Sequence, residues 1–199
     1  MAYPQVVEKL IENLTKLPGI GRKTATRLAF FLLNSKDDYV KDLAQSIVDI
    51  KEKIKLCSVC LNITDMEPCL ICKDEKRDKS KICVVEEPAH VMVMEQAYPG
   101  VFTYHVLHGV INPLEGIGPE NLRIQELIER VKNSKITEVV IATNLTLEGN
   151  TTAYYIADQL KEMNVKVTRI ASGIPAGGDI VYADPQTIKN SLDNRRLIS

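Results

Sequence analysis

Four of the five cysteines in this chain fall in two C-x-x-C pairs that lie only eight residues apart. The pairs are Cys57 with Cys60 and Cys69 with Cys72. Each pair can hold one edge of a tetrahedral metal site, and two pairs supply the four thiolates of a zinc centre. Since protein fills all four positions, no place is left for a reacting water, and we expect one structural Zn²⁺ per chain. A redox site would need only one pair.

The composition is that of an ordinary globular chain, with 45% hydrophobic and 26% charged residues among 199. The formal net charge is -1, so nucleic-acid binding would have to come from a local basic patch or from repetition in an oligomer. The N-terminal stretch carries charges inside its apolar run, and Pro, Gly and His interrupt the longest uncharged segment. We therefore expect a cytoplasmic protein with no membrane contact.

Changes in sequence pattern predict an α+β chain of several parts. Residues 1–56 carry apolar residues at helical spacing, and residues 57–72 hold the four cysteines. From 80 to 175, short β-rich runs alternate with amphipathic helices, which predicts a parallel sheet covered on both faces. A short helical extension over 176–199 follows. The charged run at 73–81 is expected to be a solvated linker.

Apolar periodicity also gives the expected boundaries of individual elements. Three apolar stripes at helical spacing precede the cysteines. The third stripe consists of Leu43, Ile47, Ile50 and Ile54. Strands are expected at 82–85, 101–107, 139–142 and 165–170, and helices at 89–96, 121–133, 151–163 and 186–192.

The segment Leu17-Pro-Gly-Ile-Gly21 predicts a tight turn between two helices. Gly19 and Gly21 permit backbone angles and a close approach that a side chain would block. The second helix should begin near Arg22, so that its free N–H groups and positive dipole end form an anion site suited to a phosphate. Lys23 and Arg27 share one helix face and would extend the contact along a nucleic-acid backbone.

This turn resembles the helix-hairpin-helix motif, which implies binding to the DNA backbone without base readout. Arg22, Lys23 and Arg27, with Gly19 and Gly21, are the expected DNA-binding residues. A simple αα-hairpin with a solvated basic face is the alternative. A nucleotide phosphate loop is excluded, because Arg22 rather than glycine precedes Lys23 and a helix rather than a strand precedes the turn.

Acidic residues follow two of the predicted strands, where open α/β sheets build their sites. Glu86 and Glu87 follow the first strand, and the segment Asn144-Leu-Thr-Leu-Glu148-Gly149 follows a later one. This arrangement resembles the Toprim domain, which holds Mg²⁺ with a Glu and a D-x-D-x-E-G segment. Here Asn144 and Thr146 replace both aspartates, and an amide and a hydroxyl bind Mg²⁺ weakly. We therefore expect Glu86, Glu87 and Glu148 to serve as an anionic partner-binding surface.

The whole order of parts resembles the RecR family of bacterial recombination mediators. The most specific stretches are LPGIGRKTATRLAFFLL (17–33), the four cysteines, YHVLHGVINPLEGIG (104–118), IATNLTLEG (141–149) and GIPAGGDIVYAD (173–184). The resemblance implies a non-enzymatic protein of DNA repair that forms a ring tetramer. It also implies work with RecO and RecF in loading RecA onto single-stranded gaps, with the Toprim acids contacting RecO.

Two other functions remain open from the residues alone. One is a Mg²⁺-dependent Toprim enzyme that acts as a nuclease, topoisomerase or primase. The other is a zinc-stabilised scaffold without nucleic-acid contact. For the mediator, a near-neutral protomer with one small basic patch implies weak binding alone, and repetition in an oligomer would raise avidity. Such binding would be independent of sequence and sensitive to salt.

Overall fold

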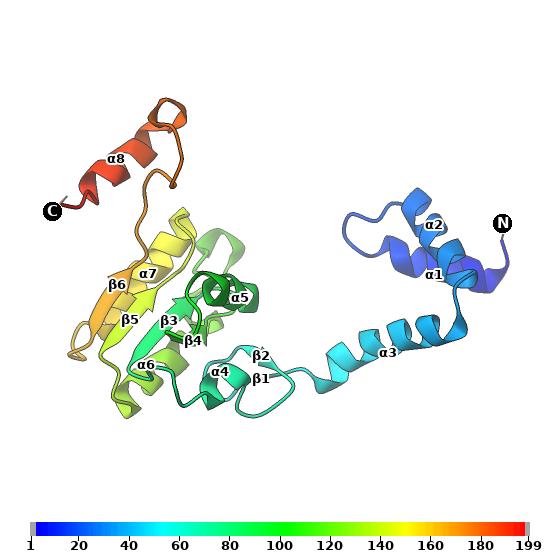
Figure 1. Cartoon of the computed structure of the whole chain (residues 1–199), viewed down its shortest axis with the longest axis horizontal. Coiled ribbons are helices and arrows are strands. Elements are labelled where there is room, and N and C mark those ends of the chain that lie inside the picture. The colour runs from blue at the N-terminus through cyan, green and yellow to red at the C-terminus, as the bar shows by residue number, and fades with distance from the viewer. Residues whose placement is uncertain (1–2, 198–199) are drawn as a thin grey trace. The chain divides into compact units, whose positions relative to one another are not determined.

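A computed structural model describes residues 3–197 of the chain. The chain divides into two compact units, Met1–Ile54 and Lys55–Ser199 (Figure 1). Eight α-helices and two sheets lie within the described residues. In that same range, no helix combines the length and apolar content needed to cross a membrane.

The first unit is built from three helices, as the apolar periodicity predicted. Helix α1 spans Gln5–Thr15, α2 spans Arg22–Leu33 and α3 spans Asp37–Lys53. Helices α1 and α2 pack closely because two alanines of α2 face α1. The fully buried residues of this small core are Ile11, Ala25 and Ala29.

Helix α3 forms as predicted, but its apolar stripe is exposed. None of its residues is buried, and Ile47 and Ile50 are 64% and 67% exposed. Together with α1 and the end of α2, it borders an open apolar groove of about 640 Å³. Val6, Leu10, Leu33, Leu43 and Ile47 are among the residues that line it. The stripe is helical as predicted, but no element within residues 3–54 covers it.

The cysteine segment forms a small knuckle at the start of the second unit. Strands β1 (Lys55–Leu56) and β2 (Ile63–Thr64) pair antiparallel, and α4 (Leu70–Lys73) carries the last cysteine. Two hydrogen bonds join the knuckle to the neighbouring α/β domain. Val106 N donates to the Cys60 carbonyl at 2.9 Å, and His108 Nε2 lies 2.7 Å from the Leu61 carbonyl.

A four-stranded parallel sheet forms the centre of the second unit, which confirms the predicted α/β domain. The strands are β3 (Lys81–Val85), β4 (Thr103–Val106), β5 (Glu138–Ile141) and β6 (Lys166–Arg169). Their order in the sheet is β4-β3-β5-β6. The buried runs of β3 and β4 agree with strands that are covered on both faces.

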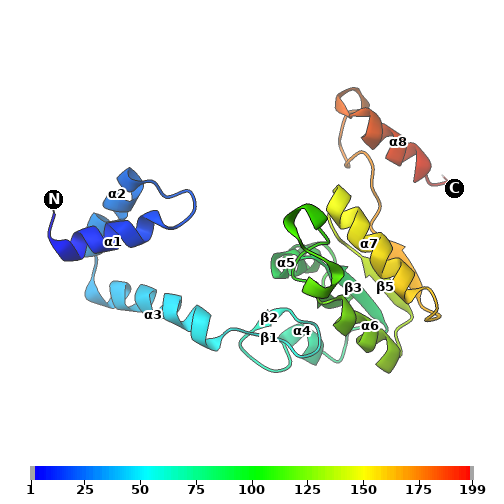
Figure 2. The same ribbon diagram turned by 180° about the vertical axis from the view of Figure 1, so that it is seen from behind.

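Helices cover both faces of this sheet (Figures 1 and 2). Helices α6 (Ile124–Asn133) and α7 (Leu147–Leu160) pack on the face that carries Ile82 and Val84. Helix α5 (Pro88–Ala97) packs on the opposite face through Val91. Cys83 is buried in this second cluster, as expected for a small hydrophobic residue.

Capping residues explain where α7 and α8 begin. Helix α7 starts at Leu147, earlier than the predicted 151, because the Thr146 hydroxyl accepts a hydrogen bond from Gly149 N at 3.1 Å. Helix α8 (Pro185–Asp193) begins after Asp184, whose carboxylate accepts from two backbone N–H groups. Short 3₁₀ turns complete the fold at Pro113–Glu115, Pro119–Asn121 and Ile180–Tyr182.

Most of the charged run at 73–81 is exposed, as a solvated linker should be, but Arg77 is an exception. Arg77 turns inward and forms a bidentate ion pair with Glu95 of α5, with both N–O distances at 2.7 Å. It also donates to the Phe102 carbonyl at 2.9 Å. Its side chain is only 9% exposed, so one residue of this run fastens the chain to the domain.

Candidate nucleic-acid interface and metal centre

The turn between α1 and α2 exposes the beginning of α2. Gly19 has φ +78°, a left-handed conformation that favours glycine. Gly21 is the N-cap residue and offers no side-chain acceptor to the first N–H groups of the helix. The first turn of α2 also contains no acidic residue. The positive end of the helix dipole therefore has no capping side chain and no acidic residue of its own first turn.

Gly21 has more room than the sequence indicated. Its φ is -78°, which any residue adopts, and a Cβ added here would meet no atom of the chain within 4 Å. Gly21 is therefore not needed to let two parts of this hairpin come close to each other. The space in front of the helix start is open to another molecule.

The three basic residues of α2 differ in their surroundings. Lys23 and Arg27 are exposed on the face opposite the buried alanines, as predicted, and take part in none of the ion pairs found among residues 3–197. Arg22 instead pairs with Glu8 of α1 at 2.8 Å. Two cations thus remain available beside the helix start, while Arg22 is also a link between the two helices.

The four predicted metal ligands lie together. Cys57, Cys60, Cys69 and Cys72 place their sulfur atoms within 4.8 Å of one another, and the Cys60 and Cys69 sulfurs are 3.5 Å apart. A tetrahedral ion with bonds of about 2.3 Å to sulfur requires its sulfur ligands to be separated by a distance close to the 3.5 Å between Cys60 and Cys69. The backbone N–H of Cys69 also points at the Cys57 sulfur, at 3.4 Å. The cluster can therefore hold a metal ion, and it is the only such group of His, Cys, Asp or Glu side chains within residues 3–197.

The thiols of this cluster strongly influence one another. Hydrogen bonding from neighbouring thiols, that of Cys72 above all, lowers the pKa of Cys60 to about 5. Burial raises the pKa of Cys69 to about 11, and the hydrogen bond to Cys60 raises the pKa of Cys72. Four thiolates in so small a space repel one another unless a cation lies between them, so this is a metal-ligand set by its chemistry.

The Toprim-like acidic site is closed by hydrogen bonds within the chain. Glu86, directly after β3, is only 7% exposed. One of its oxygens accepts from Asn144 N and the other from Asn144 Nδ2, both at 2.7 Å. The Arg169 guanidinium donates to the Asn144 carbonyl at 3.0 Å. Asn144 thus donates a hydrogen bond to each oxygen of the Glu86 carboxylate, so this buried carboxylate needs no cation beside it.

Gly149 is required for this close packing. A Cβ at this position would overlap the Asn144 carbonyl oxygen and would lie 3.1 Å from a Glu86 oxygen. Glu87 is exposed and Glu148 is half-buried at the start of α7. These three acidic residues therefore follow the same sheet edge, but they do not come together as an ion-binding cluster. Sequence spacing did not indicate the role of Arg169, which lies on the distant strand β6.

Comparison with protein-family models gives matches along most of the chain. Residues 7–51 match the model described as RecR, helix-hairpin-helix. Residues 80–171 match the Toprim domain, and residues 173–196 match the model described as RecR, C-terminal. The hairpin, the parallel sheet and the C-terminal helix described above lie within these three matches, in that order.

Proposed function

Because this chain belongs to the RecR family, we propose that it is a DNA-binding recombination mediator that acts without catalysis. It would work in the cytoplasm, associated with the nucleoid, together with RecO and RecF. Its role would be to help load RecA onto single-stranded gaps during recombinational DNA repair.

The observation that carries this proposal is the exposed start of α2. Free N–H groups and an open space at Gly21 suit the phosphates of a nucleic-acid backbone, as do the side chains of Lys23 and Arg27, which form no ion pair with any residue from 3 to 197. Such contacts carry no base information, so binding should not depend on sequence. Gly19 contributes by shaping the turn, and Arg22 by its pair with Glu8.

An oligomer, a ring tetramer as in the family resemblance, would multiply these contacts. Two cations per protomer give a weak electrostatic contact with DNA, whereas linked sites raise avidity by about 10² to 10⁴ where geometry allows joint binding. The apolar groove between α1 and α3 supports assembly, because soluble proteins seldom leave such a face uncovered.

The Toprim-like site supports a non-catalytic role. To bind Mg²⁺, Glu86 would have to give up two hydrogen bonds to Asn144, and no second carboxylate of the D-x-D pattern would replace them. Glu87 and Glu148 are then available for a basic partner surface, and we propose RecO as that partner. Glu86 would act by holding the Asn144 segment in place.

The cysteine cluster would hold one structural Zn²⁺ per chain, bound by Cys57, Cys60, Cys69 and Cys72. Such an ion would hold together a knuckle whose own strands are only two residues long. Cys57→Ser should lose the metal and lower the melting temperature of the chain. Unchanged zinc content in this variant would contradict the assignment.

The proposal is tested by the salt dependence of DNA binding. We would measure the affinity for a single-stranded oligonucleotide by fluorescence anisotropy at several salt concentrations. The Lys23→Ala/Arg27→Ala double variant should bind all sequences more weakly, with a shallower slope of log K against log salt by about 0.7 per lost phosphate contact. The control is Lys9→Ala/Lys51→Ala, which removes the same charge from exposed positions of the same unit.

Two outcomes would contradict the proposal. Equal slopes in the double variant and the control would mean that the hairpin is not the contact site. Cleavage of DNA in Mg²⁺ by the wild-type chain, lost in Glu86→Gln, would instead show a Toprim-type enzyme.

A further inference from the structure

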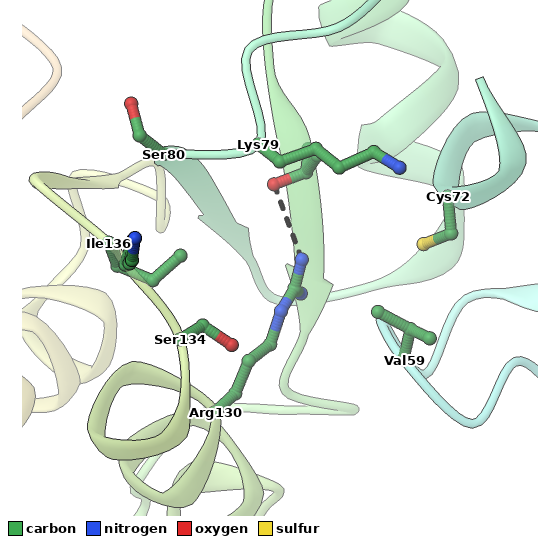
Figure 3. A pocket seen from close by; sticks show the side chains of 9 residues that line it. Val59, Cys72, Lys79, Ser80, Arg130, Ser134 and Ile136 are labelled. Carbon is green, nitrogen blue, oxygen red and sulfur yellow. Dashed lines mark hydrogen bonds between the residues drawn. The ribbon is translucent and has the colours of Figure 1, made fainter. Parts of the chain in front are cut away.

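A pocket of about 350 Å³ lies where the cysteine knuckle meets the α/β domain (Figure 3). The knuckle contributes Val59 and Cys72, and the domain contributes three cationic residues. No carboxylate is among the lining residues, which are Val59, Cys72, Lys79, Ser80, Thr103, Arg130, Ser134, Lys135 and Ile136. The pocket is therefore rich in positive charge, and the only acidic group among its lining residues is the Cys72 thiol.

Arg130 is a half-buried cation without a carboxylate partner. Its guanidinium donates to the Tyr104 carbonyl at 2.6 Å and to the Thr103 hydroxyl at 3.2 Å, both of which are neutral acceptors. It takes part in none of the ion pairs found between residues 3 and 197. Arg77, by contrast, meets Glu95 in a bidentate pair. A guanidinium that leaves water without an anion loses hydration that neutral acceptors only partly replace.

Cys72, one of the four cysteines of the cluster, lines the same pocket as Arg130. Burial lowers the pKa of Arg130, because a guanidinium loses hydration there. Cys72 is also the one ligand of the four that is not fully buried. In Figure 3 its side chain and that of Arg130 border the same space, and Lys79 extends along the rim on the side of Cys72.

A divalent ion bound by four thiolates keeps a net charge of -2, because each ligand must be deprotonated. We propose that Arg130, with Lys79 as a weaker exposed partner, is the built-in counter-charge of this metal centre and sets how tightly it holds its ion. The inference rests on the metal site of the proposed function. Cations beside metal-bound ligands stabilise the loaded state, and partners outside the ligand set typically change metal affinity by about 10- to 100-fold.

The geometry keeps this counter-charge in place. Arg130 lies on α6, whereas the knuckle is fixed to strand β4 and the loop after it by the Val106–Cys60 and His108–Leu61 contacts. Arg130 reaches the same strand through Thr103 and Tyr104. The strand is thus the common support of the thiolates and of their cation. Arg130 would act on the metal through its ligands, since it is not one of the four clustered residues.

The test measures zinc affinity by competition with a chromophoric chelator on the purified full-length chain. Arg130→Met should bind zinc at least tenfold more weakly, and Arg130→Lys should stay within about threefold of wild type. Lys132→Met is the matched control, because it removes an exposed cation from the same helix outside this pocket, and it should leave the affinity unchanged. Added salt should weaken zinc binding more in wild type than in Arg130→Met, a difference that lost packing would not produce.

Wild-type zinc affinity in Arg130→Met, or an equal loss in Arg130→Lys and Arg130→Met, would overturn the proposal. If Arg130→Met does not fold, the Lys79→Met variant tests the proposal instead, because the exposed Lys79 side chain contributes little to packing. A several-fold loss at low salt in Lys79→Met then supports the counter-charge, and wild-type affinity overturns it. Zinc stoichiometry of the wild-type chain is measured first, so that absence of the metal site itself is distinguished from failure of this inference.

Discussion

Replacing Gly21 with aspartate should stabilise the hairpin and weaken its binding to DNA. The backbone of Gly21, with φ -78° and ψ 166°, already has the geometry of a side-chain N-cap. A Cβ meets no obstacle at this position. An aspartate carboxylate would therefore accept hydrogen bonds from the free N–H groups of α2 and would occupy the place that we assign to a phosphate.

The two effects have different sizes. Asp in place of Gly at an N-cap is worth a few tenths of a kcal/mol, and a negative charge at a helix start adds about 0.3–1 kcal/mol. We expect a gain of about 0.5–1 kcal/mol in the free energy of unfolding. The added carboxylate offsets one positive charge that faces the phosphates, so the salt slope for single-stranded DNA falls by up to about 0.7 per engaged hairpin. A lost charge-assisted hydrogen bond of about 1.5–3 kcal/mol corresponds to a fall in affinity of at least tenfold.

Urea unfolding and anisotropy titration on the same preparations would measure both effects. Gln5→Glu is the control, because it adds the same negative charge at the exposed start of α1, away from the turn. We expect it to leave DNA affinity nearly unchanged. DNA binding by Gly21→Asp that equals wild type, in a protein shown to be folded, would refute the assignment of the helix start as a phosphate site.

Three further predictions concern the rest of the chain. Burial lowers the pKa of His105 to about 4, below the usual value near 6.5. The stability that its neutral form contributes is therefore complete above pH 6.5 and declines as the pH falls toward 4. Urea unfolding at pH 5 should show a loss of about 2 kcal/mol in the free energy of unfolding, and this loss should be absent in His105→Asn. Gly149→Ala should cost about 1–3 kcal/mol by crowding Asn144, whereas Thr151→Ala on the exposed side of α7 should cost far less, and equal costs would contradict the packing argument. Ile47→Asp should lower the molar mass by light scattering, and Ser46→Asp, outside the groove, should not; an unchanged mass in Ile47→Asp would exclude the groove as an assembly surface.

Features that depend on local spacing could be predicted from the sequence. The cysteine pairs converge because two short C-x-x-C turns need only a brief connection to face each other. The turn at Gly19 and the parallel sheet follow from conformational freedom at one residue and from the alternation of strands with helices. The first two signals are encoded within a few residues, and the third is repeated along the whole domain, so little tertiary context can override them.

The remaining features depend on partners far away in the sequence. Arg77 resembles its solvated neighbours in composition, and only its ion pair with Glu95, 18 residues away, shows its structural role. Glu86 and Asn144 are separated by 58 residues, and sequence could indicate a weakened metal site but not that the two would bind each other. The apolar residues of α3 recur at helical spacing, which predicts the helix. The spacing does not say whether the residues that pack on this apolar face come from the same chain.

The substitution at Asn144 changes the role of the neighbouring carboxylate. An aspartate at this position would place a second negative charge against Glu86, and two carboxylates so close remain ionised only with a cation between them. The amide of Asn144 instead donates to Glu86 and removes that need. Since the chain itself supplies hydrogen bonds to the Glu86 carboxylate, this residue stabilises the loop at Asn144 without a divalent ion. Neither Glu87 nor Glu148 then has to coordinate a metal, which agrees with the partner surface that we propose for this edge of the sheet.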